Sequence, residues 1–373
     1  MIEFNQTLYA FDFFVKLNFI RLLDFRNVEF AEVRLDAPSV WIHGANAQGK
    51  TNLLEAVGML NAARSFRAAP PEALVRRGAK TARILAEAAL DNFAGTSQIE
   101  IAVGDGKCVV VDGEKTAKLA DFIGKFPVLT ITNEDIRLLR ASPEVRRRDM
   151  DMFASSVDSA YLAQLRNYHS ALAQRNALLR AESADGHLYD AFETAMAQSA
   201  ETIIKKRKDL FAELGAAATQ KYAILAGESP DRAEISLKCS CDAETSDAFL
   251  EMLRRQRQSD LLRRTTQKGI HRDDFKIFVD AADAKTYASE GQQKSAVIAL
   301  RLAQFELAKK YLGEEPVMLF DDVLGELDAS RRRRFWSCAS PTAQILATST
   351  EEPPADGARQ WSPVRVECGK FEQ

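Results

Sequence analysis

Residues 40–54 have the sequence V-W-I-H-G-A-N-A-Q-G-K-T-N-L-L, and this stretch decides the fold of the chain. Residues 44–51 match the phosphate-loop pattern G-x-x-x-x-G-K-[ST] at every fixed position. The apolar run before the loop predicts a buried strand. The residues from Asn52 onward predict a helix whose N-terminus faces the phosphates. The stretch therefore predicts an α/β nucleotide-binding domain.

Each fixed residue of the loop has a chemical task. Gly44 and Gly49 let backbone N–H groups turn around phosphate oxygens where a Cβ would clash. We expect Lys50 to reach the β- and γ-phosphates of ATP and the Thr51 hydroxyl to ligate Mg²⁺. The predicted ATP-binding residues of this segment are Gly44, Ala45, Asn46, Ala47, Gln48, Gly49, Lys50, Thr51 and Asn52.

A second part of the nucleotide site lies downstream. Residues 317–320 are apolar and are followed by Asp321 and Asp322. A strand buried on both faces would deliver these carboxylates to the C-terminal edge of the sheet, beside the phosphate loop. We expect Asp321 to hold Mg²⁺ and Asp322 to orient and deprotonate the attacking water. Asp322 and Lys50 are thus the predicted catalytic residues.

The segment Ser289-Glu290-Gly291-Gln292 predicts a further anion site. A serine N-cap with glycine two residues later, at the start of an apolar helix, combines free N–H groups with the helix dipole. One triphosphate does not need two such cradles from one chain. We therefore expect Ser289, Gly291 and Gln292 to close over the γ-phosphate held by a second copy. An ordinary helix N-cap is the alternative interpretation.

Periodicity outlines the organisation of the rest of the chain. Alternating residues at 15–42 and between 81 and 112 predict antiparallel strands, including a hairpin around residues 104–106. Apolar residues at helical spacing predict three helices within 134–268. We expect residues 1–133 and 269–373 to form the ATPase domain and residues 134–268 to form an inserted helical lobe.

Two further expectations concern segments without a clear motif. About twenty residues at the C-terminal end are Pro-rich and polar, which predicts loose order. The basic clusters at 146–148, 205–208 and 254–257 are balanced by acidic residues in the same region, which favours solvated faces over DNA sites.

Composition limits the class of protein and its partners. The hydrophobic fraction is 46% and the charged fraction 28%, as in globular proteins. No apolar run approaches the roughly 20 residues that a membrane span needs, so no membrane partner is expected. Five scattered cysteines without zinc spacing favour free thiols in the cytoplasm. A net charge of −3 neither predicts nor excludes a nucleic-acid partner, so any DNA site must be a local patch.

Together the motifs resemble the RecF family of ABC-type ATPases in DNA repair. Besides the phosphate loop, the Ser-Glu-Gly-Gln segment, the Asp-Asp strand and Gly325-Glu326-Leu327-Asp328, the resemblance is carried by 133–139, 142–147, 161–168, 174–179 and His271-Arg272-Asp273-Asp274-Phe275. It covers the chain from about Val15. Ala47 stands where the family usually has Gly, Lys294 where Arg is usual, and Ile270 where Pro is usual. For His271, a capping role is the alternative to a family-specific one.

The resemblance implies an ABC-type P-loop ATPase head with an antiparallel β subdomain and an inserted helical lobe. It implies a slow, DNA-stimulated ATPase that forms a homodimer with ATP and Mg²⁺ and binds DNA at single-strand gaps. It also implies that the protein helps RecO and RecR to load RecA, and that it is associated with the nucleoid.

Three other interpretations stay open at this stage. One is another SMC-like ABC ATPase, although the chain has no room after the Asp-Asp strand for the metal-binding domain of the nuclease-coupled members. Another is the nucleotide-binding subunit of a transporter, which would leave the helical lobe without an explanation. A third is a module that binds ATP without turnover, which only a hydrolysis assay separates from an ATPase.

Overall fold

The computed structural model describes residues 13–67, 69–90, 95–182, 185–227, 231–240, 243–324, 329–354 and 359–373. The chain forms two compact units. Unit 1 comprises Met1–Thr130, Ala308–Gly325 and Pro341–Gln373, and unit 2 comprises Ile131–Leu307 and Glu326–Ser340. The predicted boundaries at 133/134 and 268/269 stay predictions, and unit 2 extends beyond the predicted lobe. The motif at 325–328 lies outside the described residues.

The first sheet of unit 1 carries the phosphate loop. Its strand order is β16-β15-β3-β14-β13-β8. The strands are β3 (Ser39–His43), β8 (Val128–Thr132), β13 (Val317–Asp321), β14 (Ile345–Ser349), β15 (Ser362–Glu367) and β16 (Lys370–Glu372). Strand β14 pairs in parallel with β13 and β3, and β3 with β15. The helix α1 (Lys50–Ala62) follows β3, which confirms the predicted α/β arrangement.

The second sheet of unit 1 is largely antiparallel. Its order is β12-β1-β4-β5-β6-β7, with β2 paired to β1. The strands are β1 (Phe13–Phe25), β2 (Val28–Arg34), β4 (Thr81–Leu90), β5 (Gly95–Gly104), β6 (Lys107–Val111), β7 (Glu114–Lys115) and β12 (Glu314–Glu315), and short 3-10 helices lie at Pro71–Leu74 and Leu119–Asp121. The predicted hairpin at residues 104–106 joins β5 to β6. The predicted antiparallel β subdomain is confirmed.

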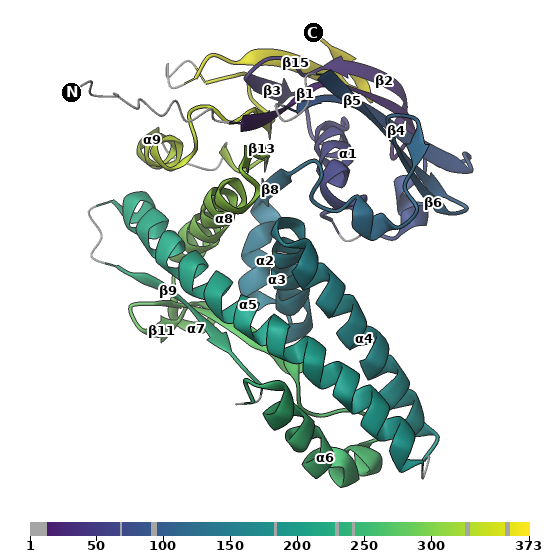
Figure 1. Cartoon of the computed structure of the whole chain (residues 1–373). Helices are drawn as coiled ribbons and strands as arrows, with labels where there is room; N and C mark the ends of the chain where they lie inside the picture. The colour runs from purple at the N-terminus through teal and green to yellow at the C-terminus, as the bar shows by residue number, and fades with distance from the viewer. Residues whose placement is uncertain are drawn as a thin grey trace, which may run out of the picture. The chain divides into compact units, whose positions relative to one another are not determined.

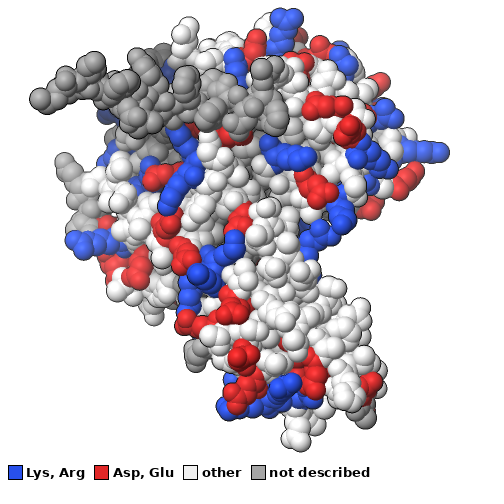
Figure 2. Space-filling view, in the orientation of Figure 1, with Lys and Arg blue, Asp and Glu red and all other residues white. Residues whose placement is uncertain are grey.

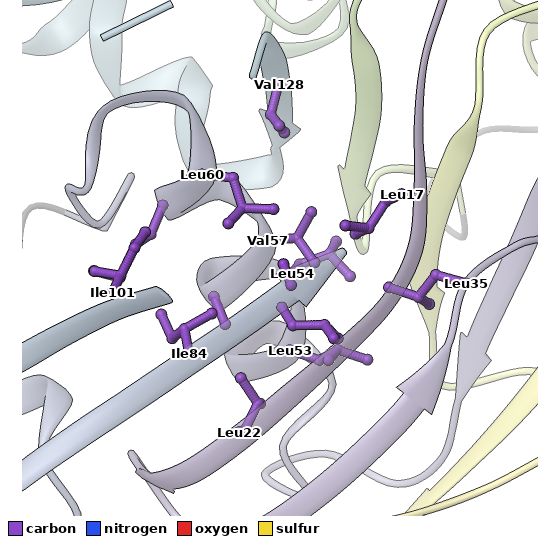
Figure 3. Packing of buried hydrophobic residues seen from close by; sticks show 14 of the residues in the cluster. Leu17, Leu22, Leu35, Leu53, Leu54, Val57, Leu60, Ile84, Ile101 and Val128 are labelled. Carbon is purple, nitrogen blue, oxygen red and sulfur yellow. The ribbon is translucent and has the colours of Figure 1, made fainter. Parts of the chain in front are cut away.

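The core of unit 1 is built around α1 (Figure 3). Leu53, Leu54, Val57 and Leu60 of this helix are at most 2% exposed. Figure 3 shows them among apolar side chains from several strands, including Leu17, Leu22, Ile84, Ile101 and Val128, and from Leu35 just after β2. Burying an aliphatic side chain of this size stabilises a fold by about 1.5–3 kcal/mol. The position of the phosphate loop therefore depends on packing between α1 and the strands.

Gln344 supplies a polar link inside this core. Its Oε1 accepts a hydrogen bond from the Leu17 N–H (2.7 Å), and its Nε2 donates to the Leu17 carbonyl (2.9 Å) and to the Leu35 carbonyl. The side chain is 5% exposed. A buried amide with satisfied donors and acceptors fixes the register of the segments that it joins. Gln344 therefore ties the start of β14 to β1.

The expectation of loose order at the C-terminal end is wrong. Strand β15 pairs in parallel with β3, and β16 turns back to pair with β15. Val364 is 0% exposed and Val366 is 2% exposed. The V-R-V alternation at 364–366 is a period-two strand pattern, and the Pro-rich composition of the preceding residues masked it.

Unit 2 is mainly helical (Figure 1). Its helices are α2 (Arg137–Arg140), α3 (Pro143–Val157), α4 (Ser159–Arg180), α5 (Gly186–Ala226), α6 (Ser246–Arg263), α7 (Ala284–Tyr287), α8 (Glu290–Leu312, to Leu307 in this unit) and α9 (Ala329–Cys338), with 3-10 helices at Asn133–Ile136 and Ile270–Arg272. Helix α5 packs along α4 and also contacts α6. A sheet ordered β11 (Ala282–Asp283), β10 (Asp274–Val279) and β9 (Ala233–Lys238) completes the unit. Strand β9 was not predicted.

Two of the basic clusters are not simply solvated faces. Arg207, 1% exposed, donates to Asp151 Oδ1 (2.7 Å), Asp273 Oδ2 (2.7 Å) and the Ile270 carbonyl (2.9 Å). Arg146, 8% exposed, forms a bidentate pair with Asp274. The prediction is wrong at these two positions because each guanidinium compensates a carboxylate that is distant in sequence. These arginines hold α3 and α5 to the segment around residues 270–274.

We expect Arg207→Met to destabilise the protein by about 3–5 kcal/mol, because it leaves the Asp273 carboxylate buried without its cation. Burial raises the pKa of Asp273 and the Arg207 guanidinium opposes that shift. Protonation of Asp273 removes the uncompensated buried charge. The variant should therefore lose less free energy of unfolding, relative to the parent, at pH 5 than at pH 8. Urea unfolding at both pH values measures the effect. The control is Lys205→Met, which removes the same charge from an exposed position of the same helix. Equal urea midpoints for Arg207→Met and Lys205→Met would contradict the conclusion that Arg207 compensates the buried Asp273 carboxylate.

Candidate nucleotide-binding site

The phosphate loop connects the end of β3 to α1 and has glycines at two positions with positive φ, the first of which has no room for a Cβ. Gly44 has φ +150°, and a Cβ there would lie 2.3 Å from the Val366 carbonyl oxygen. Gly49 has φ +116°, and a Cβ there would lie 3.2 Å from Asn27 Oδ1. Both glycines of the sequence pattern are therefore required by backbone conformation and by close neighbours.

Ala47, which stands where the family usually has Gly, adopts an unfavourable backbone conformation. Its φ is +64°, in the left-handed region that glycine adopts readily. An alanine in that conformation is disfavoured by roughly 1–2 kcal/mol. The loop therefore has the left-handed conformation at position 47 even though alanine disfavours that conformation.

The turn between β15 and β16 supports the phosphate loop through hydrogen bonds. The Gln48 carbonyl accepts a hydrogen bond from the Gly369 N–H (2.9 Å), and Gln48 Oε1 accepts one from the Cys368 N–H (2.6 Å). On the other side, Asn52 Nδ2 donates to Asn27 Oδ1 (2.6 Å) in the turn between β1 and β2. Sequence reasoning missed the support from residues 366–369. The alternation of Val364 and Val366 before Cys368-Gly369 was the available signal.

Lys50 lies folded against the loop. Its side-chain Nζ donates to the carbonyls of Gly44 (2.8 Å) and Ala45 (2.9 Å), and the residue is 4% exposed. These two carbonyls hold the ammonium group where incoming phosphate oxygens can replace them as acceptors. The predicted role of Lys50 as the main cation for the phosphates is compatible with this position.

Thr51 and Asp321 meet at the end of β13. Thr51 Oγ1 donates to Asp321 Oδ1 (2.9 Å), and Thr348 Oγ1 of β14 donates to the same oxygen (2.8 Å). Burial raises the pKa of the Asp321 carboxyl, and the hydrogen bonds from Thr348 and Thr51 oppose the shift. A partly desolvated carboxylate with two hydroxyls beside it offers the oxygen ligands that a hard cation prefers.

The donor set fits Mg²⁺. Magnesium prefers oxygen ligands and is usually bound by one or two carboxylates together with substrate phosphates, rather than by a cage of protein ligands alone. Thr51 and Asp321 supply a hydroxyl and a carboxylate. Over the described part of the chain, no group of three or more His, Cys, Asp or Glu side chains could hold a metal ion by itself. Thr51 and Asp321 would hold Mg²⁺ together with phosphate oxygens of the nucleotide.

Asp322 adopts a conformation that suits its residue type. Its φ is +56°, in the left-handed region that Asp and Asn visit more readily than other side chains. Its N–H donates to Thr348 Oγ1 (3.0 Å), which fixes the backbone beside Asp321. Its predicted role as general base stays a prediction.

Arg67 is a site residue that sequence reasoning did not predict. Its Nη1 donates to Asn52 Oδ1 (3.3 Å) and lies 3.7 Å from Glu55 Oε2. Its charge also lowers the pKa of Asp321, in opposition to burial. Glu55 is 0% exposed and is paired mainly with Arg26 (2.6 Å). Arg67 therefore places a partly exposed cation close to the predicted metal carboxylate. No local sequence pattern reports such proximity.

The Ser-Glu-Gly-Gln segment begins α8 with a reciprocal cap. The Ser289 N–H donates to Gln292 Oε1 (2.8 Å), and the Gln292 N–H donates to Ser289 Oγ (3.3 Å). Gln292 Nε2 also donates to Asp231 Oδ2 (2.8 Å). The N-cap is therefore present in this chain by itself. The proposed role of Ser289, Gly291 and Gln292 toward a second copy stays a prediction.

The neighbouring Gln293 holds the residues that precede this N-cap in place. It is 5% exposed, and its Oε1 accepts from Arg140 Nη2 (2.9 Å). Its Nε2 donates to the carbonyls of Ala284 (2.9 Å) and Ala288 (3.0 Å). The second glutamine of the segment thus holds α7 and α2 against the first turn of α8.

His271 belongs to the scaffold of unit 2. Its Nε2 lies 3.1 Å from the Thr266 carbonyl and must donate to it, so Nδ1 accepts from the Tyr168 hydroxyl (2.8 Å). Burial lowers the pKa of His271 to about 4. The imidazole is therefore neutral at physiological pH. Together with Asp273 and Asp274, which pair with Arg207 and Arg146, it explains the His-Arg-Asp-Asp segment as a structural junction.

Comparisons with known proteins were made for the whole chain. It is 32% identical over 345 residues to the DNA replication and repair protein RecF of Symbiobacterium thermophilum, covering 90% of this chain and 91% of that protein. It is 32% identical over 367 residues to RecF of Bacillus subtilis, covering 94% and 98%. A comparison with models of protein families gives no match.

Solved structures give the same result. The chain resembles a structure of the recombination mediator protein RecF with ATP in the RecFOR pathway, with TM-score 0.90, 27% identity and coverage of 98% of this chain and 99% of that chain. It also resembles the Smc head domain from Pyrococcus furiosus, with TM-score 0.54, 15% identity and coverage of 96% and 95%. The second likeness concerns the fold alone. The predicted ABC-type ATPase head fold is confirmed.

We expect Lys50→Ala to weaken ATP binding by about 100-fold or more, because charge-assisted hydrogen bonds contribute about 1.5–3 kcal/mol each. Isothermal titration calorimetry with ATP and Mg²⁺ measures the loss. The control is Lys80→Ala, which removes an exposed lysine of the same unit. Unchanged affinity in a folded Lys50→Ala protein would show that the phosphates bind elsewhere.

We expect Asp322→Asn to keep ATP and Mg²⁺ binding but to slow hydrolysis by about 10²–10⁴-fold, as for loss of a general base. Asparagine tolerates the left-handed conformation of this residue, so the backbone should not change. Single-turnover hydrolysis measures the chemical step directly. A normal rate would move the general base to another residue, such as Glu326, which lies outside the described residues.

Proposed function

We propose, because the chain belongs to the RecF family of DNA replication and repair proteins, that it is an ATP-dependent DNA-binding protein of recombinational repair. The observation that carries this proposal is the junction of Thr51 and Asp321 (2.9 Å) beside a complete phosphate loop. That junction provides a metal position where a phosphate loop holds the β- and γ-phosphates. A RecF structure with ATP among the similar structures supports ATP as the ligand.

The reaction follows from the residues of unit 1. Lys50 would exchange the Gly44 and Ala45 carbonyls for phosphate oxygens, and Thr51 and Asp321 would hold Mg²⁺ at the nucleotide. The ion neutralises charge on the phosphates when bound. Asp322 orients water and accepts its proton. We infer a slow ATPase that DNA stimulates.

The signature segment supports ATP-dependent dimerisation. The helix N-terminus capped by Ser289 offers N–H groups to an anion, and the phosphate loop of the same chain already supplies one complete cradle. Two symmetric copies would bury two nucleotides, each held between one phosphate loop and the other chain's signature. Dimerisation is then linked to ATP by contacts that ADP cannot make.

DNA is the proposed macromolecular ligand. Figure 2 shows Lys and Arg side chains mixed with Asp and Glu over the described part of the face that it displays. The net charge of the chain is −3. This mixture supports a DNA site composed of basic residues that dimerisation brings together. We infer that single-strand gaps are the preferred DNA, and that the bound dimer helps RecO and RecR to load RecA.

In the described ranges, no helix has the length and apolar character to cross a membrane. The alternative of a transporter subunit has less support on a separate ground. The family relationship accounts for the helical unit, which a transporter assignment leaves unexplained. We propose a cytoplasmic, nucleoid-associated protein.

A DNA-binding assay tests the proposal as a whole. Fluorescence anisotropy with gapped duplex DNA should show tight binding with ATP and Mg²⁺ and weak binding with ADP. Blunt duplex of equal length and sequence is the matched control for gap recognition. Equal affinity with ATP and ADP would overturn the coupling between nucleotide and DNA.

We expect Ser289→Arg to bind ATP as the parent does, yet to remain monomeric and to lose ATP-dependent DNA binding, because the added side chain blocks the partner's γ-phosphate. Analytical ultracentrifugation with ATP and Mg²⁺ measures the association. The matched control is Lys285→Ala, at an exposed position of the adjacent helix α7. A dimer formed by Ser289→Arg as readily as by the parent would refute the shared site.

A further inference from the structure

Cations gather at the last turn of α1, the end of the helix opposite to the phosphate loop. Lys107, the first residue of β6, donates from Nζ to the carbonyl of Ala63, the residue that ends the helix (2.6 Å). Arg64 follows Ala63 directly, and its charge acts on Lys107. A lysine and an arginine that are distant in sequence thus lie together in unit 1.

A further segment brings another cation to the same turn. The Gly124 N–H donates to the carbonyl of Asn61 in α1 (3.0 Å), which places Lys125 beside the end of the helix. Arg64, Lys107 and Lys125 are all exposed. We call these three residues the α1 basic cluster. No sequence pattern predicted it, because its members come from three separate segments of the chain.

Carboxylates of the described chain do not neutralise this cluster. None of its members forms an ion pair with a described Asp or Glu. Partial burial and the charge of Arg64 both lower the pKa of Lys107, and no carboxylate opposes that shift. The acidic residues nearest in sequence, Asp105 and Asp121, are exposed. At Lys276, by contrast, a carboxylate lies 2.8 Å from the ammonium. Binding of an anion would therefore relieve repulsion within the cluster.

The helix terminus explains only part of the arrangement. A helix C-terminus attracts cations, and the ammonium of Lys107 on the Ala63 carbonyl satisfies that tendency. Lys50, at the other end of α1, is held in a similar way on the carbonyls of Gly44 and Ala45, and phosphate oxygens are its proposed acceptors. A lysine that rests on a carbonyl can exchange that acceptor for a phosphate oxygen, which makes a stronger, charge-assisted hydrogen bond.

We propose that Arg64, Lys107 and Lys125 bind phosphates of the DNA backbone. This inference rests on the proposed function, in which DNA is the macromolecular ligand, and it assigns residues of unit 1 to that DNA site. Each cation can neutralise one phosphate and release a counterion. Helix α1 has 13 residues, so about 20 Å separate the cluster from Lys50. DNA and nucleotide are then bound at opposite ends of one helix.

The salt dependence of DNA binding tests the contact directly. Fluorescence anisotropy measures the affinity for gapped duplex DNA with ATP and Mg²⁺ at several salt concentrations. We expect Arg64→Ala, Lys107→Ala and Lys125→Ala each to weaken binding at least threefold and to reduce the slope of log K against log salt by about one unit. Lys107→Arg should restore both quantities.

Lys370→Ala is the matched control. It removes an exposed lysine of the same unit from β16, which packs beside β2, whereas β1, β4 and β5 separate β2 from β6. Its affinity and its salt slope should match those of the parent. Equal melting temperatures of the variants and the parent exclude a folding defect, and the exposed positions of Arg64 and Lys125 make such a defect easy to avoid.

ATP turnover gives a second measurement. The three alanine variants should bind ATP and hydrolyse it without DNA within twofold of the parent, because the cluster lies at the far end of α1. At a DNA concentration that just saturates the parent, they should lose most of the stimulation by DNA. Higher DNA concentrations should restore it. A lower rate without DNA would overturn the assignment, because the cluster would then serve the nucleotide site.

The outcomes separate the two proposals. If the parent does not bind gapped DNA with ATP, the proposed function fails and the role of the cluster fails with it. If the parent binds DNA and the three alanine variants match it in affinity and salt slope, only the role of the cluster is overturned. Weaker binding with an unchanged salt slope would also overturn it, because no phosphate contact would then have been lost.

Discussion

The close approach of the Val366 carbonyl to Gly44 is the constraint on which the nucleotide site depends. A Cβ at Gly44 would stand 2.3 Å from that oxygen, so strand β15 and the phosphate loop fit together only through a glycine. The contacts of Gln48 with Cys368 and Gly369 continue the same support. The loop is thus held by its flanking strand and helix and also by a hairpin from the far end of the sequence. This support keeps its N–H groups in place without a ligand.

Unit 2 depends on a different principle, the compensation of buried charge. Arg175, at 0% exposed, meets Glu193 and Asp260, and Arg301 meets Asp135 and Asp149. The Arg175–Glu193 pair joins the consecutive helices α4 and α5, whereas Asp260 and both partners of Arg301 come from segments distant in sequence. Because a buried charge must meet its partner, these pairs favour one arrangement of the segments that they join.

The sequence was sufficient where function imposes a local pattern. The phosphate loop, the apolar strand before Asp321 and the hairpin at residues 104–106 follow rules that act over a few residues, and these elements were predicted correctly. Strand β15 was missed because a V-R-V alternation is short and follows Pro-rich chain. Arg67 was missed for a deeper reason, since its relevance lies in a distance to Asn52 that no spacing in the sequence encodes. The same applies to Arg146 and Arg207, whose carboxylate partners are distant in sequence.

The hairpin beneath the phosphate loop also has a consequence for synthesis of the protein. Gln48 and Cys368, which share a hydrogen bond, are 320 residues apart. On the ribosome, the residues that recognise phosphate emerge early, whereas those that brace them emerge among the last. A nascent chain therefore exposes the loop sequence for most of its translation without the support that shapes it. The braced form of the loop therefore requires that synthesis has reached Gly369.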